Sequence, residues 1–297
     1  MLLKENTLDL FFDTEFRRVH PFRVQLLKWI GNKQRFAHEI ASFFPAAFKT
    51  YYEPFLGSGA VLATLCPPNA VGADVFPPLM EIWITLQKDP DKVLQWYEER
   101  YKVFYSKPRP FGYELIKSSY NACPNGADLL FLSRSCYGGV VRFRKSDGYM
   151  STPCGVHDPI SPSAFLEKLQ RWHTRTRNTT FLCQDFETTI NMAQEGDLVY
   201  CDPPYKHSQT ILYGGQDFSL NRLMLCISDA KERGVNVALS LDGKKKSGSV
   251  VCQLHLPDGL FEREIFISCG RSMLRRFQRE GDSLDDEFVE DRLLITY

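Results

Sequence analysis

The 297-residue sequence lacks a long hydrophobic run, a C-x-x-C pair and an internal repeat. No apolar stretch approaches the roughly 18 residues that a membrane helix needs, so we expect none. The first residues, MLLKENTLDLFFDTEF, carry acids among the apolar ones and no small-residue cleavage site, which argues against a signal peptide. The nine cysteines are odd in number, which disfavours a disulfide framework, and without C-x-x-C spacing they predict no metal site. Reduced thiols in a cytoplasmic protein are therefore expected.

The chain also has no excess of charge of either sign, because 36 basic residues balance 36 acidic ones. The distribution is uneven, however. From Arg134 to Arg177 there are eight Lys and Arg residues against three Asp and Glu. Such a local excess fits a polyanion partner, because affinity follows the local patch and not the overall charge. Solvated helix faces would account for the same residues equally well.

No Gly/Ser-rich linker divides the chain, and its apolar runs return at the spacing of an α/β protein. Strands are predicted at residues 51–54 and 70–74, with a helix from Ala60 to Leu65 between them. Before them, a strand-like run from Phe22 leads into the amphipathic pattern RFAHEIASFF, which predicts a helix. From Thr179 onward the strand-like runs are TTFLC, DLVYC, NVALSLD, EREIFIS and DRLLITY. We expect a doubly wound sheet.

The middle of the chain has a different character. Helical patterns run into the loop-rich, basic and aromatic stretch CYGGVVRFRKSDGYMSTPCG, where alternation around a Ser-Asp-Gly turn predicts a β-hairpin. In that hairpin Arg142 and Arg144 lie on one face and Phe143 on the other. We therefore predict an α/β domain in two parts, residues 1–76 and 179–297, interrupted by an inserted region at residues 77–178.

The loop Glu53-Pro-Phe-Leu-Gly57-Ser-Gly59 follows the first predicted strand. Its two glycines can take positive φ and let a ligand approach bare backbone. The loop lacks the Lys-Ser/Thr of a P-loop and the third glycine of the dinucleotide fingerprint, so on its own it equally fits a tight turn. Asp74, at the end of the next strand, strengthens the case for a ligand, because a carboxylate there can bind both hydroxyls of a ribose.

The stretch Val199-Tyr-Cys-Asp202-Pro-Pro-Tyr205 ends another predicted strand. Two consecutive prolines cannot extend a helix, and they remove two donors from any ladder. They hold Asp202 and Tyr205 in a stiff segment at the carboxyl end of the strand. A proline-stiffened surface turn would have the same sequence, so the tetrapeptide alone does not decide between a turn and a binding device.

Taken in order, these motifs resemble those of the adenine-N6 DNA methyltransferases of the Dam type. The order is K-W-x-G-x-K (Lys28 to Lys33), F-x-G-x-G (Phe55 to Gly59) and D-P-P-Y (Asp202 to Tyr205), and the closing EDRLLITY resembles the family's last strand. The resemblance implies a Rossmann-like, S-adenosylmethionine-dependent methyltransferase sheet. In that sheet, residues 77–178 would form an inserted, helical and β-hairpin DNA-recognition region.

The resemblance also implies roles for individual residues. S-adenosylmethionine would lie over Phe55, Gly57 and Gly59, with its ribose on Asp74 and its methionyl end near Trp29, Lys33 and Asp202. Asp202 and a backbone carbonyl of Pro203 or Pro204 would accept hydrogen bonds from the adenine amino group, and Tyr205 would stack on a base flipped out of the duplex. No metal would be required. Contacts with double-stranded DNA are expected from Tyr137, Arg142, Arg144 and Lys145, of which the two arginines could read guanine.

Several alternatives remain open at this point. Cytosine-N4 methylation uses the same amino-group geometry, although that chemistry usually has serine in place of Asp202. A catalytically silent DNA-binding module could retain the fold, and the hairpin could contact only phosphate. The family often has asparagine where Gly138 stands, so no base preference carries over. A restriction-modification system, with a cognate endonuclease as partner, is an expectation from the resemblance alone.

Overall fold

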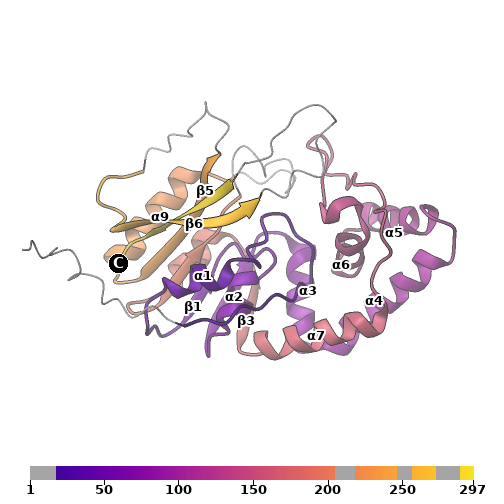
Figure 1. Ribbon diagram of the computed structural model, residues 1–297, viewed down its shortest axis with the longest axis horizontal. Coiled ribbons are helices and arrows are strands. Elements are labelled where there is room, and N and C mark those ends of the chain that lie inside the picture. The colour runs from indigo at the N-terminus through magenta and orange to yellow at the C-terminus, as the bar shows by residue number, and fades with distance from the viewer. Residues whose placement is uncertain (1–17, 205–217, 246–255, 272–287) are drawn as a thin grey trace, which may run out of the picture.

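A computed structural model describes residues 18–204, 218–245, 256–271 and 288–297 of the chain. These residues form a seven-stranded sheet in the order β3-β2-β1-β4-β5-β7-β6 (Figure 1). The strands are β1 (Tyr51–Glu53), β2 (Ala70–Asp74), β3 (Thr179–Cys183), β4 (Leu198–Cys201), β5 (Asn236–Lys245), β6 (Arg263–Arg271) and β7 (Phe288–Ile295).

The sheet is parallel from β3 to β5, whereas β7 runs antiparallel to both of its neighbours. In register, Tyr51 lies opposite Ala70 in β2 and Leu198 in β4. Every residue of β1, β2 and β4 is buried. That explains their continuous apolar runs, because strands inside a parallel sheet are covered on both faces.

Alternate residues of the central strands belong to two different hydrophobic clusters. Tyr51 and Tyr200 pack in a cluster with Trp83, and Tyr52 and Val199 pack in the other. This separation follows from the period of two along a strand, which sends successive side chains to opposite faces. Helices supply the other half of each cluster: α1 (Ala37–Ser42), α2 (Ala60–Leu65) and α3 (Pro77–Lys88) for the first, and α8 (Phe186–Asn191) and α9 (Leu220–Glu232) for the second.

The strand order places the site at one edge of the sheet. β2 and β3 lie on one side of β1, and β4 and β5 lie on the other, so the boundary between β1 and β4 is the topological switch point. In open α/β sheets a crevice forms there, outside the carboxyl ends of the strands. Glu53 ends β1, Asp74 ends β2 and Asp202 directly follows β4. Three acids from distant parts of the sequence therefore lie at one edge.

The helices between β2 and β3 gather at the end of the molecule away from β5 and α9 (Figure 1). Besides α3 they are α4 (Pro90–Tyr105), α5 (Phe111–Ala122), α6 (Gly126–Ser135) and α7 (Pro162–Thr176). Every residue of α6 is buried, because α3, α4 and α5 all pack against it. Tyr97 of α4 stacks on Phe165 of α7 with ring centroids 4.0 Å apart.

The strand predicted from Phe22 is wrong. Residues 22–27 are buried for the most part but form no strand. Side chains bind the backbone carbonyls that a neighbouring strand would otherwise satisfy: Trp172 Nε1 donates to Val24 O at 2.9 Å, and Arg134 donates to Leu26 O at 2.8 Å. The apolar pattern predicted correctly that the segment is buried. It did not determine a strand, because a buried segment does not need a neighbouring strand when side chains bind its backbone groups.

Among the described residues, no helix is both long enough and apolar enough to cross a membrane.

Candidate active site

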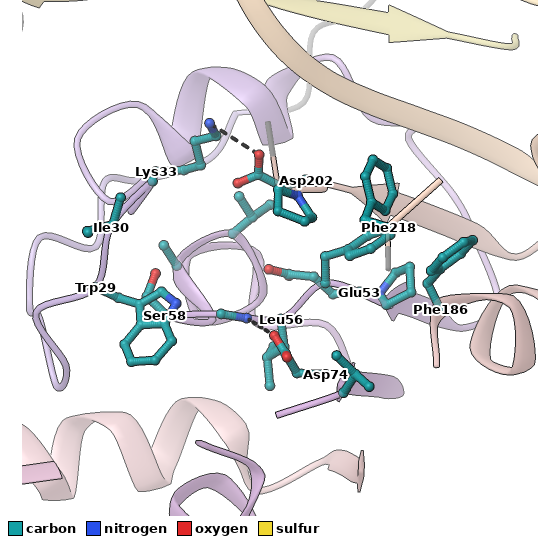
Figure 2. A pocket seen from close by; sticks show the side chains of 18 of the residues that line it. Trp29, Ile30, Lys33, Glu53, Leu56, Ser58, Asp74, Phe186, Asp202 and Phe218 are labelled. Carbon is teal, nitrogen blue, oxygen red and sulfur yellow. Dashed lines mark hydrogen bonds and ion pairs between the residues drawn. The ribbon is translucent and has the colours of Figure 1, made fainter. Parts of the chain in front are cut away.

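A cavity of about 380 Å³ lies at the carboxyl ends of β1, β2 and β4 (Figure 2). Trp29, Lys33, Phe55, Gly57 and Asp74 line it, as do Asp202 and Pro204. The structure thus brings together residues of all three motifs that the sequence singled out, although Gly59 is not among the lining residues. Pro203 is buried, and Tyr205 lies outside the described residues. The roles of these residues remain predictions.

The glycine loop has the backbone that its sequence predicted. Gly57 has φ +48° and Gly59 has φ +61°, a region that side chains with a Cβ rarely adopt. A Cβ on Gly57 would come within 3.4 Å of the Trp29 ring. The loop is also anchored, since Trp83 Nε1 donates to Gly57 O at 3.1 Å. A ligand in the cavity therefore meets bare backbone held in place, with Trp29 alongside.

Asp74 fixes the loop and faces the cavity at the same time. It accepts hydrogen bonds from the backbone N–H groups of Gly57 and Phe76, both at 3.1 Å. Burial raises the pKa of Asp74 to about 6, although these two bonds and one from Val75 oppose the rise. The two carboxylate oxygens together have about four acceptor sites, so the carboxylate can still accept a hydrogen bond from a ligand hydroxyl.

Lys33 pairs with the acid of the D-P-P-Y motif. Its Nζ lies 3.2 Å from Asp202 Oδ1 and 3.0 Å from Asp291 Oδ2 (the first contact is drawn in Figure 2). Burial would lower the pKa of Lys33, but Asp202, Asp291 and Tyr200 outweigh that effect and raise it above its ordinary value. Lys33 is therefore an ammonium group at any physiological pH. The resemblance predicts Lys33 near the methionyl end of the cofactor and gives no role to Asp291.

Sequence reasoning also assigned no role to Glu53, which lines the floor of the cavity and is 3% exposed. The Tyr51 hydroxyl donates to Glu53 Oε2 at 2.7 Å. Burial raises the pKa of Glu53 to about 8. The hydrogen bond from Tyr51 opposes this rise, and the negative charge of Asp202 adds to it. Glu53 is thus largely protonated at neutral pH. The sequence does carry a signal for Glu53: it is an acid at the end of a buried strand, the same feature that identified Asp74 as a site residue.

We predict that this protonation couples to ligand binding. A positively charged ligand in the cavity favours ionised Glu53, so binding below about pH 8 should release a proton. The affinity for S-adenosylmethionine, the cofactor that the resemblance implies, should then rise from pH 7 toward the pKa of Glu53. Asp74, with a pKa of about 6, is already ionised over this range. Calorimetry in buffers of different ionisation enthalpy measures the released proton. The α-amino group of the cofactor titrates in the same range, so only the part of the pH dependence and of the proton release that Glu53 causes should be lost in Glu53→Gln. An unchanged dependence there would place the titrating group elsewhere.

Three aromatic rings and an ion pair form a second wall of the cavity. Phe55 stacks on Phe186 with centroids 5.1 Å apart, and Phe218 meets Phe55 edge-on at 5.8 Å. Arg222 pairs with Asp185 and lies with its guanidinium carbon 4.6 Å from the Phe186 ring centroid. Flat apolar surface beside a carboxylate suits a heteroaromatic ring with polar edges. These residues, Phe55 excepted, had no predicted role, although Asp185 is one more acid just beyond a strand end.

The basic hairpin lies between β2 and β3. It pairs through a single antiparallel bridge, Phe143 to Met150, and the flanking residues form no strands. The Ser151 N–H donates to Arg142 O, and the Arg144 N–H donates to Tyr149 O, both at 2.9 Å. Phe143 is buried, whereas Arg142 and Arg144 are exposed, so alternation places both arginines on the outer face. Arg144 also contacts Asp147 at 2.9 Å within the turn.

The remaining residues expected at DNA are on the same surface segment. Lys145 is exposed, and Tyr137 is 41% exposed in the 3₁₀ turn Tyr137–Gly139 (η1). A Cβ on Gly139 would come within 2.7 Å of Lys28 Cδ, so the start of the K-W-x-G-x-K motif packs against the base of the hairpin. The active site and the hairpin are therefore connected through Lys28 and Trp29.

Part of the local basic excess is internal and not available to a partner. Arg134 is 8% exposed and binds backbone carbonyls, as described above. Arg175 donates to Ala63 O at 3.0 Å, at the end of α2. These two guanidinium groups bind the fold's own carbonyls, whereas Arg142, Arg144, Lys145, Arg171 and Arg177 of the same stretch are exposed.

Within the described residues, no group of three or more His, Cys, Asp and Glu side chains is placed to hold a metal ion.

Comparison with known proteins gives the same family as the motifs. The DNA N-6-adenine-methyltransferase of Escherichia phage P1 is 27% identical over 246 residues, which are 78% of this chain and 32% of that protein. The retron Ec67 DNA adenine methylase of Escherichia coli is 31% identical over 192 residues, 61% of this chain and 63% of that one. The type II methyltransferase M.MjaIII of Methanocaldococcus jannaschii is 30% identical over 209 residues, 63% and 70% of the respective chains.

The chain thus spans about a third of the phage protein and just under two thirds of the retron protein. Its residues 29–248, well over half of the sequence, match the family of D12 class N6 adenine-specific DNA methyltransferases. The match includes F-x-G-x-G, D-P-P-Y and all of K-W-x-G-x-K except Lys28. This chain belongs to that family.

Proposed function

We propose that the protein transfers a methyl group from S-adenosylmethionine to N6 of adenine within a specific sequence of double-stranded DNA. The observation that carries the proposal is the position of Asp202. It follows β4 at the switch point of the sheet and shares one cavity with the glycine loop and Asp74. Family membership supports the same reaction.

The residues of the cavity fit S-adenosylmethionine by their chemistry. Asp74 can accept from the ribose hydroxyls, and Phe55 and Phe186 offer flat surface to the adenine ring of the cofactor. Asp185 can accept from the edge of that ring, and Glu53 can compensate positive charge. When bound, the cofactor supplies an electrophilic methyl group on a positively charged sulfur.

The D-P-P-Y segment then orients the amino group that attacks. Asp202 lies 3.2 Å from the Lys33 ammonium group and can accept one N–H of the adenine amino group. A backbone carbonyl of Pro203 or Pro204 would accept the other, and the prolines contribute no competing donors. With both protons held, the nitrogen lone pair points toward the methyl donor, which lowers the entropic cost of reaching the transition state. Tyr205 is expected to stack on the flipped base.

The first test is sequencing with modified-base detection of DNA from cells that express the protein and lack other adenine methylation. N6-methyladenine at one short motif is the expected result. Methylation of cytosine instead would assign the alternative substrate. Binding of S-adenosylmethionine and DNA without any modified base would contradict the proposed reaction and favour a silent binding module.

We further predict that the exposed arginines of the hairpin read bases. An arginine that forks onto guanine O6 and N7 contributes about 1–3 kcal/mol of discrimination, so Arg142→Ala or Arg144→Ala should relax preference at one position of the site. Lys145→Ala is the matched control on the same turn, because loss of a phosphate contact weakens all sequences alike and reduces the salt slope by about one. Methylation rates on single-base variants of the mapped duplex measure both effects. An unchanged ranking of duplexes for both arginine variants would refute base reading by this hairpin.

The similarity to a type II methyltransferase suggests a restriction-modification setting, with a cognate endonuclease as partner. Such an enzyme would cleave the mapped motif only where it is unmethylated. A cytoplasmic location is predicted together with this setting, because bacterial or phage DNA is accessible there.

A further inference from the structure

Asp291, in the last strand of the chain, is not among the residues that line the cavity. Its carboxylate nevertheless lies 3.0 Å from Lys33 Nζ, which in turn lies 3.2 Å from Asp202. The side chains of Lys33 and Asp291 are 6% and 8% exposed, and that of Asp202 is 17% exposed. Asp291 therefore does not contact the cavity itself, but it can affect Asp202 through Lys33, which contacts both carboxylates.

The three residues come from distant segments. Lys33 lies in the loop before α1, Asp202 follows β4, and Asp291 lies in β7. Because β5 separates β4 from β7 in the sheet, the two carboxylates are not on adjacent strands. The Lys33 ammonium group contacts both and so links the catalytic edge to the far half of the sheet.

The charges of this cluster do not cancel. One ammonium group between two carboxylates leaves a net charge of −1, whereas Lys33 and Asp202 alone would form a neutral pair. Neutralisation would weaken Asp202 as an acceptor for the adenine amino group. The effect is large in a buried site, where solvent screens charges little. Negative charge is needed at this point because methyl transfer makes the acceptor nitrogen more positive.

We propose that Asp291 is a positioning residue of the methyl-transfer site: it holds Lys33 in place and balances its charge, so that Lys33 does not cancel the negative charge that Asp202 presents to the substrate. This inference rests on the proposed function, since it takes the role of Asp202 from it. The raised pKa of Lys33 agrees with it: burial opposes the charge on Lys33, and the carboxylates of Asp202 and Asp291 together overcome that opposition.

The first experiment compares single-turnover methylation at saturating S-adenosylmethionine and saturating DNA of the mapped sequence. Asp291→Asn removes the charge and keeps the shape, and it should slow the reaction about tenfold or more. Asp291→Glu keeps the charge and should retain most of the rate. Equal rates for the Asn variant and the wild type would overturn the inference. A Glu variant that folds and is as slow as the Asn variant would overturn it too, because charge would then not be the cause.

Glu264→Gln is the matched control. It breaks the ion pair between Glu264 and Arg292, 2.6 Å apart, which joins β6 to the residue next to Asp291 in the chain. Its rate and melting temperature should be close to those of the wild type. A loss in Glu264→Gln equal to that in Asp291→Asn would show that any lost ion pair on β7 has this effect, and would overturn the specific role.

A double variant tests whether Asp291 acts through Lys33. In a Lys33→Gln background, Asp291→Asn should change the single-turnover rate by less than about twofold, because the residue it balances is gone. A merely structural role for Asp291 predicts that the two losses multiply. Multiplying losses would overturn the inference.

The last readout needs neither cofactor nor DNA. In protein labelled with ¹⁵N-lysine, the ammonium protons of Lys33, identified by their loss in Lys33→Gln, should exchange with water several-fold faster in Asp291→Asn than in the wild type or Glu264→Gln. Unchanged exchange would overturn the contact itself. A wild type that methylates no DNA would instead overturn the proposed function, while the exchange measurement still decides whether Asp291 holds Lys33.

Discussion

Replacing Asp202 with alanine should slow methyl transfer by about 100- to 1000-fold, the range seen when one group that hydrogen-bonds the reacting centre is removed. The affinity for S-adenosylmethionine should change little, because the glycine loop and Asp74 are untouched. The physical reason is orientation. Without the acceptor at the end of β4, the amino group of a flipped adenine keeps its place in the site but loses the direction of its lone pair.

The variant should fold, because Lys33 keeps Asp291 as a partner at 3.0 Å and no buried ammonium group is left alone. Single-turnover rates on the mapped duplex, calorimetric titration with S-adenosylmethionine and a melting curve separate chemistry from binding and folding. Asp202→Asn keeps the shape and one acceptor oxygen without the charge, so its rate should lie between those of Asp202→Ala and the wild type. A rate near that of the wild type for Asp202→Ala would contradict the mechanism.

Replacing Asp74 with alanine should weaken S-adenosylmethionine binding by about 1.5–3 kcal/mol, the range for a hydrogen bond to a charged group. That corresponds to roughly a 10- to 150-fold higher Kd. Two effects act in the same direction. The ribose loses its acceptor, and Gly57 loses the bond of 3.1 Å that holds the loop. Calorimetry without DNA measures the change, and single-turnover rates at saturating cofactor should recover toward those of the wild type.

Asp197 provides a matched control for the loss of a buried carboxylate. It is 4% exposed and accepts backbone bonds from Thr50 at 2.9 Å and Gln194 at 2.8 Å, much as Asp74 does. Asp197 lies just before β4, at the opposite edge of the sheet from the cavity. Asp197→Ala should lower the melting temperature and leave cofactor affinity unchanged. Equal losses of affinity in the two variants would mean that general loosening of the sheet, and not contact with ribose, sets the effect.

Much of the fold follows from local patterns. β2 begins and ends as predicted, at Ala70 and Asp74, and α2 spans Ala60–Leu65 as predicted. The alternation around Phe143 placed two arginines on the outer face of the hairpin, where the structure has them. These features depend on the periods of strands and helices, on proline, and on glycines that need positive φ. All of these act over a few residues, so one sequence is enough to predict them.

The meeting of the glycine loop, Asp74 and Asp202 was also predictable, for a different reason. Parallel strands in a doubly wound sheet place their carboxyl ends at one edge, so acids at strand ends converge whatever their separation in sequence. Asp74 and Asp202 share the cavity on this account. The same rule applied to Glu53 and Asp185 would have added both to the site, since each stands at or just beyond a strand end.

Only the tertiary structure decided what the charged groups contact. Lys33 lies between Asp202 and Asp291 because β7 enters the sheet antiparallel, next to β5, and brings a residue from the end of the chain to the catalytic edge. The run from Phe22 is buried without a strand because Arg134 and Trp172 bind its carbonyls. The period and composition of a segment determine whether it is buried. Its partners depend on strand order and on long-range packing, which no local pattern contains.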